Sequence, residues 1–330
     1  MKKIINHPDN FVNESIKGLV VSYPEIYQFS SDTNKVLLRK NKSNNKVGLV
    51  SGGGSGHLPL FTGYIGTGLL DSCAIGNVFA SPSVDEISTA IKEANSGKGV
   101  LCIYGNYGGD VMNFDMASEM LEMEDIKVES IVVADDVASA SYDEKEKRRG
   151  VTGMLYVFKI TGAMAETGAD FDEVKRVALK TNENIRTMGI ALTPTILPQA
   201  GKPTFEIGDD EMEIGMGIHG EPGIRRGKLK SADEITEELS EKLLGDINLS
   251  NGDKVSILVN SLGATPHEEL FIVANKFNSI LNDKGIVNSK SYVGRYATSM
   301  EMSGLSISIL KLDDELEKLL LEKANCPFWY

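Results

Sequence analysis

The stretch Val47-Gly-Leu-Val-Ser-Gly-Gly-Gly-Ser-Gly-His57 decides how the first part of this chain of 330 residues is expected to fold. An apolar run, which predicts a strand, leads directly into four glycines and a lone histidine. Glycines leave backbone N–H groups uncovered, so a small polar ligand can approach them closely. Three interpretations are open: a phosphate cradle, a flexible linker, or a loop that holds His57 against a small substrate.

The stretch matches neither common nucleotide-binding motif. A Walker loop requires GxxxxGK[ST], and no Lys-Ser or Lys-Thr follows these glycines. In the dinucleotide motif GxGxxG, His57 stands where the last glycine belongs. What remains is a strand-to-helix turn with His57 at its far end, where the imidazole can act as acid, base or hydrogen-bond partner. A surface loop with a capping histidine explains the same residues equally well.

The order of strand, short Gly- or Asp-rich loop and helix recurs downstream. Residues 99–104 read as a strand, the loop after it ends at Asp110, and a helical pattern covers residues 114–121. Such repeats predict an α/β fold with a largely parallel or mixed sheet flanked by helices. Ligands bind beyond the carboxyl ends of these strands, where each loop falls. Helical patterns then extend from Gly150 to about Ile190, so we place a domain boundary near residues 185–195.

Composition excludes several classes of function. The net charge is -13 and no basic run occurs, which argues against direct nucleic-acid binding. The three cysteines have no CxxC spacing, so we expect reduced thiols. No apolar run approaches about 18 residues, and the start Met1-Lys-Lys-Ile-Ile is too short and too soon polar for a signal peptide. These features predict a soluble cytoplasmic protein without a membrane contact.

Two further residues are candidates for chemistry. Asp110 is either the N-cap of a helix or a carboxylate beside His57, where the two would form an acid/base pair. His219 lies between small residues in Gly-Ile-His-Gly-Glu-Pro-Gly, which leaves its imidazole reachable from a cleft. A neutral imidazole is a nucleophile towards a carbonyl carbon. His7 and His267 lack such settings.

The sequence predicts neither a metal site nor a cofactor. His57 and His219 lack the local spacing of zinc ligands. The pair Asp135-Asp136 at a strand end has the chemistry to bind magnesium, but two such acids more often solvate or cap a loop.

Eight stretches together are more specific than any one of them. They occur in the order "GLVSGGGSGH", "NYGGDVMNF", "DDVA", "RRGV", "GIALTP", "GMGIHGEPG", "LVNSLGAT" and "TSMEMSGLSISILKLDD". In order and spacing they resemble the dihydroxyacetone-binding subunit of bacterial dihydroxyacetone kinases. The resemblance runs from Met1 to about Asp314, nearly the whole chain.

The resemblance implies two α/β domains in a homodimer, with the N-terminal arm packed on the second domain. The N-terminal domain is then expected at residues 15–188. The second domain is expected to combine residues 1–14 with residues 189–330.

The resemblance also implies a covalent mode of ligand binding. His219 matches the histidine whose distal ring nitrogen adds to the ketone carbon of dihydroxyacetone, forming a hemiaminal. Glycerol has no carbonyl and cannot form this adduct. Asp110 and His57 match the pair that assists hydroxyl activation during phosphoryl transfer. The residues that match the loop holding the ligand hydroxyls are Gly54, Ser55, Gly56 and His57.

Four positions depart from the kinase pattern. Leu58 replaces the acid of "GHEP", and Asn77 stands where an acidic residue usually follows glycine. Gly105 replaces the lysine of "KNYTGD", and Gly108 replaces its threonine. Phosphoryl transfer depends on fixed positive charge around the moving group, so losing a lysine harms transfer more than carbonyl capture. The departures fit retained binding with little or no turnover.

Two hypotheses of different class follow. In the first, the protein is a dihydroxyacetone-sensing coactivator that binds a transcription regulator of the kinase operon, as a known paralogue in this family does. In the second, it is the substrate-binding subunit of a dihydroxyacetone kinase, which requires a separate nucleotide-binding subunit. An inert structural paralogue is disfavoured because His219 is retained in "GIHGEPG".

Overall fold

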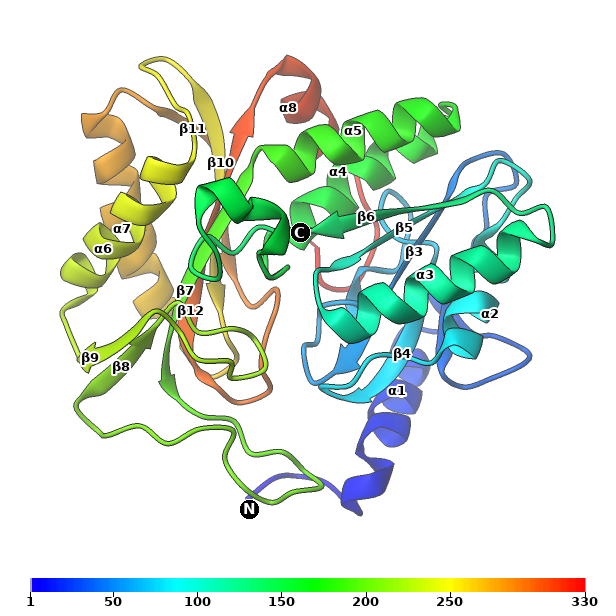
Figure 1. Ribbon diagram of the computed structural model, residues 1–330, viewed down its shortest axis with the longest axis horizontal. Helices are drawn as coiled ribbons and strands as arrows, with labels where there is room; N and C mark the ends of the chain where they lie inside the picture. Colours follow the sequence, from blue (N-terminus) through cyan, green and yellow to red (C-terminus); the bar gives the residue numbers. More distant parts are fainter. Residues whose placement is uncertain (1, 330) are drawn as a thin grey trace.

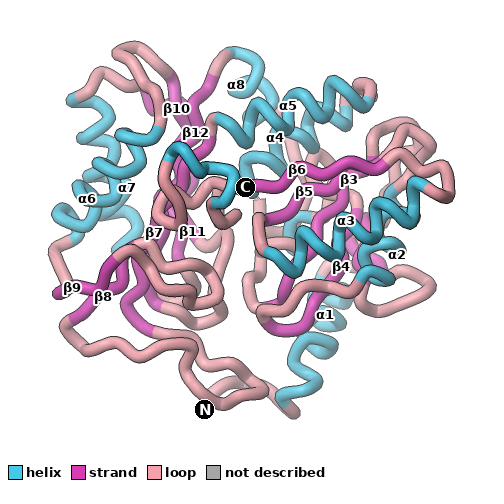
Figure 2. The backbone as a smooth tube through the Cα atoms, viewed as in Figure 1, coloured by secondary structure: helices cyan, strands magenta, loops and turns pink. Residues whose placement is uncertain are grey.

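Two six-stranded sheets, each flanked by helices, make up the structure, a computed structural model that describes residues 2–329 (Figure 1). The tube view separates the two sheets and their helices clearly (Figure 2). The α/β fold class expected from the sequence is confirmed.

The first sheet has the strand order β1-β2-β4-β3-β5-β6. Strands β4, β3, β5 and β6 pair in parallel, and β1 and β2 add an antiparallel edge. The strands are β1 Tyr27–Phe29, β2 Val36–Arg39, β3 Gly48–Ser55, β4 Ser72–Val78, β5 Val100–Gly105 and β6 Val128–Val133.

Alternating side chains of the central strands feed two separate cores. Val50 and Cys102 face a cluster formed with helices α2 (Val84–Ala94) and α3 (Gly108–Glu122). Leu49 and Ile103 point to the other face and join a larger cluster. This period of two is what a strand covered on both faces requires.

The second sheet has the order β11-β10-β12-β7-β8-β9, with only β10 and β11 parallel. Its strands are β7 Ile185–Thr193, β8 Glu211–Ile214, β9 Arg225–Lys228, β10 Lys254–Ser261, β11 Val287–Gly294 and β12 Ser303–Leu312. Helices α6 (Ala232–Asp246) and α7 (His267–Asp283) share one core with this sheet. The remaining α-helices are α1 Phe11–Ser22, α4 Met154–Glu166, α5 Phe171–Glu183 and α8 Asp314–Leu321, and the 3₁₀ helices are η1 Pro8–Asn10, η2 Thr62–Tyr64 and η3 Tyr142–Lys147.

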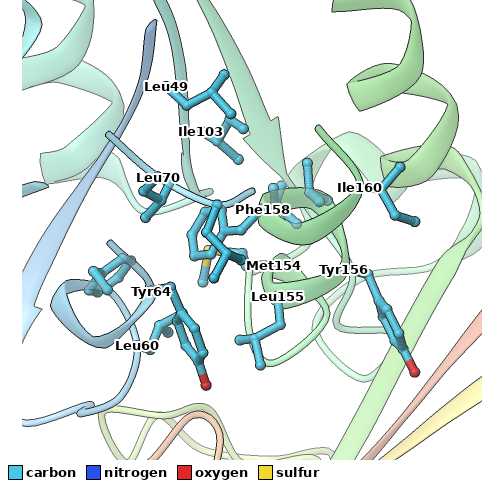
Figure 3. Packing of buried hydrophobic residues seen from close by; sticks show 14 of the residues in the cluster. Leu49, Leu60, Tyr64, Leu70, Ile103, Met154, Leu155, Tyr156, Phe158 and Ile160 are labelled. Atoms are coloured by element: carbon cyan, nitrogen blue, oxygen red, sulfur yellow. The ribbon is translucent and has the colours of Figure 1, made fainter. Parts of the chain in front are cut away.

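Helix α4 joins the two halves of the molecule. It is buried along nearly its whole length and packs Phe158 into the cluster that contains Leu49 and Ile103 (Figure 3). On its other side the hydroxyl of Tyr156 lies 3.0 Å from that of Ser256 in β10. The helix therefore fixes the two sheets relative to each other.

Two local expectations from the sequence are wrong. The helical pattern expected to reach about Ile190 ends at Glu183, and β7 begins at Ile185. This strand was not recognised because it is buried on both faces and therefore lacks the alternation of polar and apolar residues typical of a strand. The glycine stretch is not a strand-to-helix turn: β3 extends through Ser55, and the next α-helix begins at Val84. The glycines lie inside a buried strand, where a Cβ at Gly54 would come 2.8 Å from the Cα of Phe79.

The N-terminal arm contacts both halves. Lys3 forms an ion pair with Glu301, and the side chain of Gln199 donates to the carbonyl of Pro8 at 3.1 Å. Val12 in α1 packs with the core of the first sheet. The expected boundary between residues 188 and 189 falls inside β7.

The ends of the expected second domain, Met1 and Tyr330, lie outside the described residues. Between them, no helix is both long and apolar enough to cross a membrane. The cysteines are buried and unpaired.

Candidate functional site

His57 lies in the turn after β3, where Gly56 adopts a φ of 105° that favours glycine. The imidazole is fully buried, and its Nδ1 lies 2.6 Å from the carbonyl oxygen of Thr298. A carbonyl oxygen only accepts, so Nδ1 carries the proton and Nε2 carries a lone pair. Nε2 is buried and has no hydrogen-bond partner among residues 2–329.

The surroundings of His57 keep it neutral. Its ring stacks on Phe79 with the centroids 4.8 Å apart and the planes 12° apart. Burial, and secondarily the nearby His219, lower the pKa of His57 to about 3, although the bond to Thr298 opposes this shift. At neutral pH His57 therefore acts as a hydrogen-bond acceptor or base at Nε2.

His219 lies in the connection between β8 and β9 and is held by Glu221. Its Nδ1 lies 2.8 Å from Oε1 of Glu221, and its backbone N–H donates to Oε2 at 2.9 Å. Burial alone would raise the pKa of Glu221, but its hydrogen bonds and its electrostatic interaction with His219 lower it to about 2. A carboxylate at Nδ1 fixes the tautomer in which Nε2 carries the lone pair.

The two histidines meet although they come from opposite halves of the molecule. Their ring centroids lie 4.7 Å apart at an interplanar angle of 75°. Phe79 and Tyr107 stand edge-on to His219, with centroids at 5.2 Å and 4.8 Å. The two histidines are thus surrounded by aromatic side chains.

Asp110 is the third residue of α3, and the N-cap of this helix is Tyr107. The interpretation of Asp110 as an N-cap is therefore wrong. Its side chain is 7% exposed, and burial raises its pKa to about 6 against the opposing effects of a hydrogen bond from Ser81 and the charge of His219. Asp110 is close enough to His219 to interact with it electrostatically.

Three buried polar atoms at this site have no hydrogen-bond partner within the described part of the chain. They are Nε2 of His57, Oδ1 of Asp110 and the hydroxyl oxygen of Tyr107. An unsatisfied buried polar group costs about 1–3 kcal/mol, so such clusters need an explanation. A small ligand with several hydroxyls would supply donors and acceptors to these atoms.

The glycine-rich turn holds the site together through its own contacts. The hydroxyl of Ser55 donates to the carbonyl of Gly76 at 2.8 Å. The carbonyl of Gly56 accepts from the N–H of Met300 at 2.8 Å. The turn thus connects the first sheet to the loop that carries Thr298, whose carbonyl holds His57.

The four positions that depart from the kinase pattern have different settings. Leu58 follows His57 and is 41% exposed. Asn77 is exposed and its side chain accepts from Lys35 at 3.2 Å. A Cβ at Gly105 would lie 3.1 Å from the ring of Tyr107, whereas one at Gly108 would meet nothing within 4 Å.

A separate cavity of about 520 Å³ lies along the same glycine strand. It is bounded by residues 53–56, α1 and the N-terminal arm, and its lining does not include His57, Asp110 or His219. It is therefore not the histidine site.

No group of three or more His, Cys, Asp or Glu side chains suited to a metal ion occurs in residues 2–329. Asp135 accepts from the backbone N–H groups of Val151 and Gly153, both at 2.7 Å. Asp136 pairs with Arg149 at 2.7 Å. These two acids stabilise the loop after β6.

Sequence reasoning missed Glu221, Phe79 and Tyr107, among the residues around the histidines. Glu221 lies two residues after His219 in the same glycine-rich stretch, and that spacing was an available signal. Phe79 and Tyr107 follow strands β4 and β5, at the edge where ligands of α/β sheets bind. Nothing in their local sequence distinguishes them from core aromatics.

The structure is a pair of α/β halves that brings one histidine from each half together. The model of the Dak1 domain matches residues 17–328, and the chain belongs to this family.

Its relatives include substrate-binding subunits of kinases. The dihydroxyacetone-binding subunit DhaK of the PTS-dependent dihydroxyacetone kinase 1 of Listeria innocua is 47% identical over 315 residues, covering 96% of this chain and 95% of the relative. The corresponding subunit of Lactococcus lactis is 46% identical over 329 residues and covers 99% of both chains. This chain thus belongs with the dihydroxyacetone-binding subunits.

A solved structure with a different role is also similar. The dihydroxyacetone kinase operon co-activator Dha-DhaQ superposes with a TM-score of 0.88 at 34% identity, over 94% of this chain and 96% of the other. The family therefore includes kinase subunits and a coactivator.

Proposed function

We propose that this chain captures dihydroxyacetone as a covalent hemiaminal on Nε2 of His219 and reports the captured ketone to a transcription regulator, as a coactivator that forms a homodimer. The observation that carries the proposal is the hydrogen bond of 2.8 Å between Nδ1 of His219 and Glu221. This bond directs the lone pair to Nε2, which makes that atom the nucleophile.

The capture step balances without any further reactant. A bond forms between Nε2 and the ketone carbon, and the carbonyl π bond opens. The imidazole loses its Nδ1 proton through Glu221 to solvent water, and the ketone oxygen takes one proton from water, so that in net one proton moves from the imidazole to the new hydroxyl. No atom leaves, so the adduct forms and dissociates reversibly.

The neighbouring residues would orient the ligand. Nε2 of His57 is an acceptor for one ligand hydroxyl, since its pKa near 3 keeps the ring neutral. Oδ1 of Asp110 is a second buried acceptor. A three-carbon ketone with two hydroxyls matches this set of one nucleophile and two acceptors, whereas glycerol lacks the carbon that His219 attacks.

The sensing role is supported by missing positive charge. Phosphoryl transfer is accelerated by fixed cations around the moving group. Gly105 supplies none where the kinase pattern has lysine, and Tyr107 and Gly150 confine the space beside it. The similar fold of the coactivator Dha-DhaQ supports the same role.

A second candidate function is the substrate-binding subunit of a dihydroxyacetone kinase. The identities of 47% and 46% to kinase subunits favour it. His57 and Asp110 are both present to activate a hydroxyl. In this role a separate nucleotide-binding subunit supplies the phosphoryl group.

Two measurements on the same protein separate these functions. Dihydroxyacetone labelled with ¹³C at the carbonyl carbon reports capture, because the NMR signal moves from the carbonyl region to that of a saturated carbon. Phosphotransfer is assayed in parallel with a nucleotide-binding subunit. Capture without transfer supports the sensor, capture with rapid transfer supports the kinase subunit, and absence of capture refutes both.

A further inference from the structure

Helix α3 is apolar on two opposite faces. Phe114, Ala117 and Leu121 are buried against the first sheet. On the outer face Met112, Met116 and Met120 follow one another at i, i+4 and i+8, the spacing of one helix face. A helix that only covers a sheet needs one apolar face, so the second one requires its own explanation.

The outer methionines are truly exposed. Met112 is 58% exposed, Met116 49% and Met120 43%, and Met123 just past the helix is 81% exposed. We call these four residues the methionine ridge. In Figure 1, α3 lies on the outer side of the first sheet, with α2 beside it. Exposed contiguous apolar side chains mark interaction surfaces, and methionine is favoured there because it adapts to its partner.

The charged side chains on α3 itself are all acidic, and Lys92 of α2, which lines a pocket with Met120, is already paired with Glu124. Asp115, Glu119 and Glu122 lie on α3, all three exposed, and the helix contains no Lys or Arg. Within residues 2–329 none of the three takes part in an ion pair. A partner that covers the ridge must therefore present positive charge around an apolar centre.

Two other occupants fit these charges poorly. A second copy docked through the same face would place the acids of one α3 against those of the other, because a two-fold interface joins identical patches. An anionic membrane surface would be repelled in the same way. The charges favour a basic protein.

We propose that the methionine ridge is the docking surface for this chain's protein partner, which contributes a basic face with an apolar centre. The proposal rests on the proposed function, in which the chain acts together with another protein. Helix α3 also carries Asp110 in its first turn, so a partner seated on the ridge contacts the same helix that contributes to the ligand site.

The test compares a triple-glutamine variant of α3 with a double-glutamine variant of α7. Met112→Gln/Met116→Gln/Met120→Gln removes the three ridge side chains that lie on the helix, and because these side chains are exposed the fold is expected to persist. Phe271→Gln/Ile272→Gln on α7 is the matched control, since those residues are 56% and 53% exposed. The probes are a transcription regulator and a nucleotide-binding kinase subunit encoded with this chain, each measured separately by calorimetry with and without dihydroxyacetone.

We expect the ridge variant to bind its partner at least about 30-fold more weakly, while the α7 variant stays within about 2-fold. Capture of labelled dihydroxyacetone stays unchanged in both variants, which separates failure of docking from failure of the proposed capture. Equal partner binding by both variants would overturn the proposal, as would binding of neither probe by the unmodified chain. A change of oligomeric state in the ridge variant alone would identify a second copy as the occupant and equally overturn it.

A charge reversal gives a second readout. Glu119→Lys/Glu122→Lys should weaken the same complex and reduce its dependence on salt, because rim charges act mainly on association. A complex unaffected by this change would contradict a basic partner face.

Discussion

The imidazole rings of His57 and His219 lie with their centroids 4.7 Å apart, although one belongs to the turn after β3 and the other to the connection between β8 and β9. Each ring is held at Nδ1, by the carbonyl of Thr298 and the carboxylate of Glu221 respectively. Both Nε2 atoms therefore carry lone pairs. The site thus contains two imidazole nitrogens of the same chemical type, each held through its ring by a different partner.

Glu221→Gln should weaken capture of dihydroxyacetone. The amide preserves the shape but loses the negative charge that holds Nδ1–H of His219. Because a hydrogen bond to a charged group contributes roughly 1.5–3 kcal/mol, we expect about a 10- to 100-fold loss in affinity, measured by titration of labelled ketone. The exposed Glu206→Gln in a nearby loop is the control, and equal affinities for the two variants would contradict the role of Glu221.

Asp110→Asn should stabilise the protein in a pH-dependent way. The pKa of Asp110 is raised to about 6 from 3.8, so the folded state favours the protonated carboxyl. Its contribution is most favourable below the unfolded pKa and is lost as pH rises through about 6. Asparagine avoids that loss, so the variant's advantage should grow to about 3 kcal/mol between about pH 4 and about pH 7.

Urea unfolding of the Asp110→Asn variant and the unmodified chain across this range measures the difference. A constant difference at all pH values would show that Asp110 ionises as freely in the folded protein as in the unfolded chain.

Gly54→Ala should destabilise the fold. A Cβ at Gly54 would lie 2.8 Å from the backbone of Phe79, which cannot rotate away. Overpacking of this kind costs about 1–3 kcal/mol, read from thermal or urea unfolding. Gly108→Ala is the matched control: a Cβ there meets nothing within 4 Å, so its stability should change by less than about 1 kcal/mol. Equal losses in both variants would refute close packing as the reason for Gly54.

The sequence allowed the α/β fold to be predicted, and the resemblance pointed to two histidines that lie together in the structure, but neither showed how the glycine stretch packs. Strand and loop patterns around Val47–Val50 are local and visible, and the resemblance supplied His57 and His219. The packing of Gly54 on Phe79 joins residues distant in the chain, so no local pattern reveals it. Buried strands such as β7 also lose the alternation that distinguishes a strand from a helix.

The residue that holds the ring of His57 could not be predicted from the sequence either. Thr298 reaches His57 across 241 positions of sequence, through a contact that only the fold creates. For Asp110, in contrast, the local sequence pattern suggested one of two roles, and that role is wrong. Its position after a glycine-rich loop suggested an N-cap, but the helix begins earlier, at Gly108, and places the carboxylate inside the first turn.

The most direct test of covalent capture is the ¹³C spectrum of carbonyl-labelled dihydroxyacetone bound to the unmodified chain and to His219→Ala. The account predicts a new signal of a saturated carbon with the unmodified chain, absent with His219→Ala and retained with His267→Ala. A bound ketone whose carbon keeps its carbonyl shift, or a saturated-carbon signal that survives His219→Ala, would contradict it.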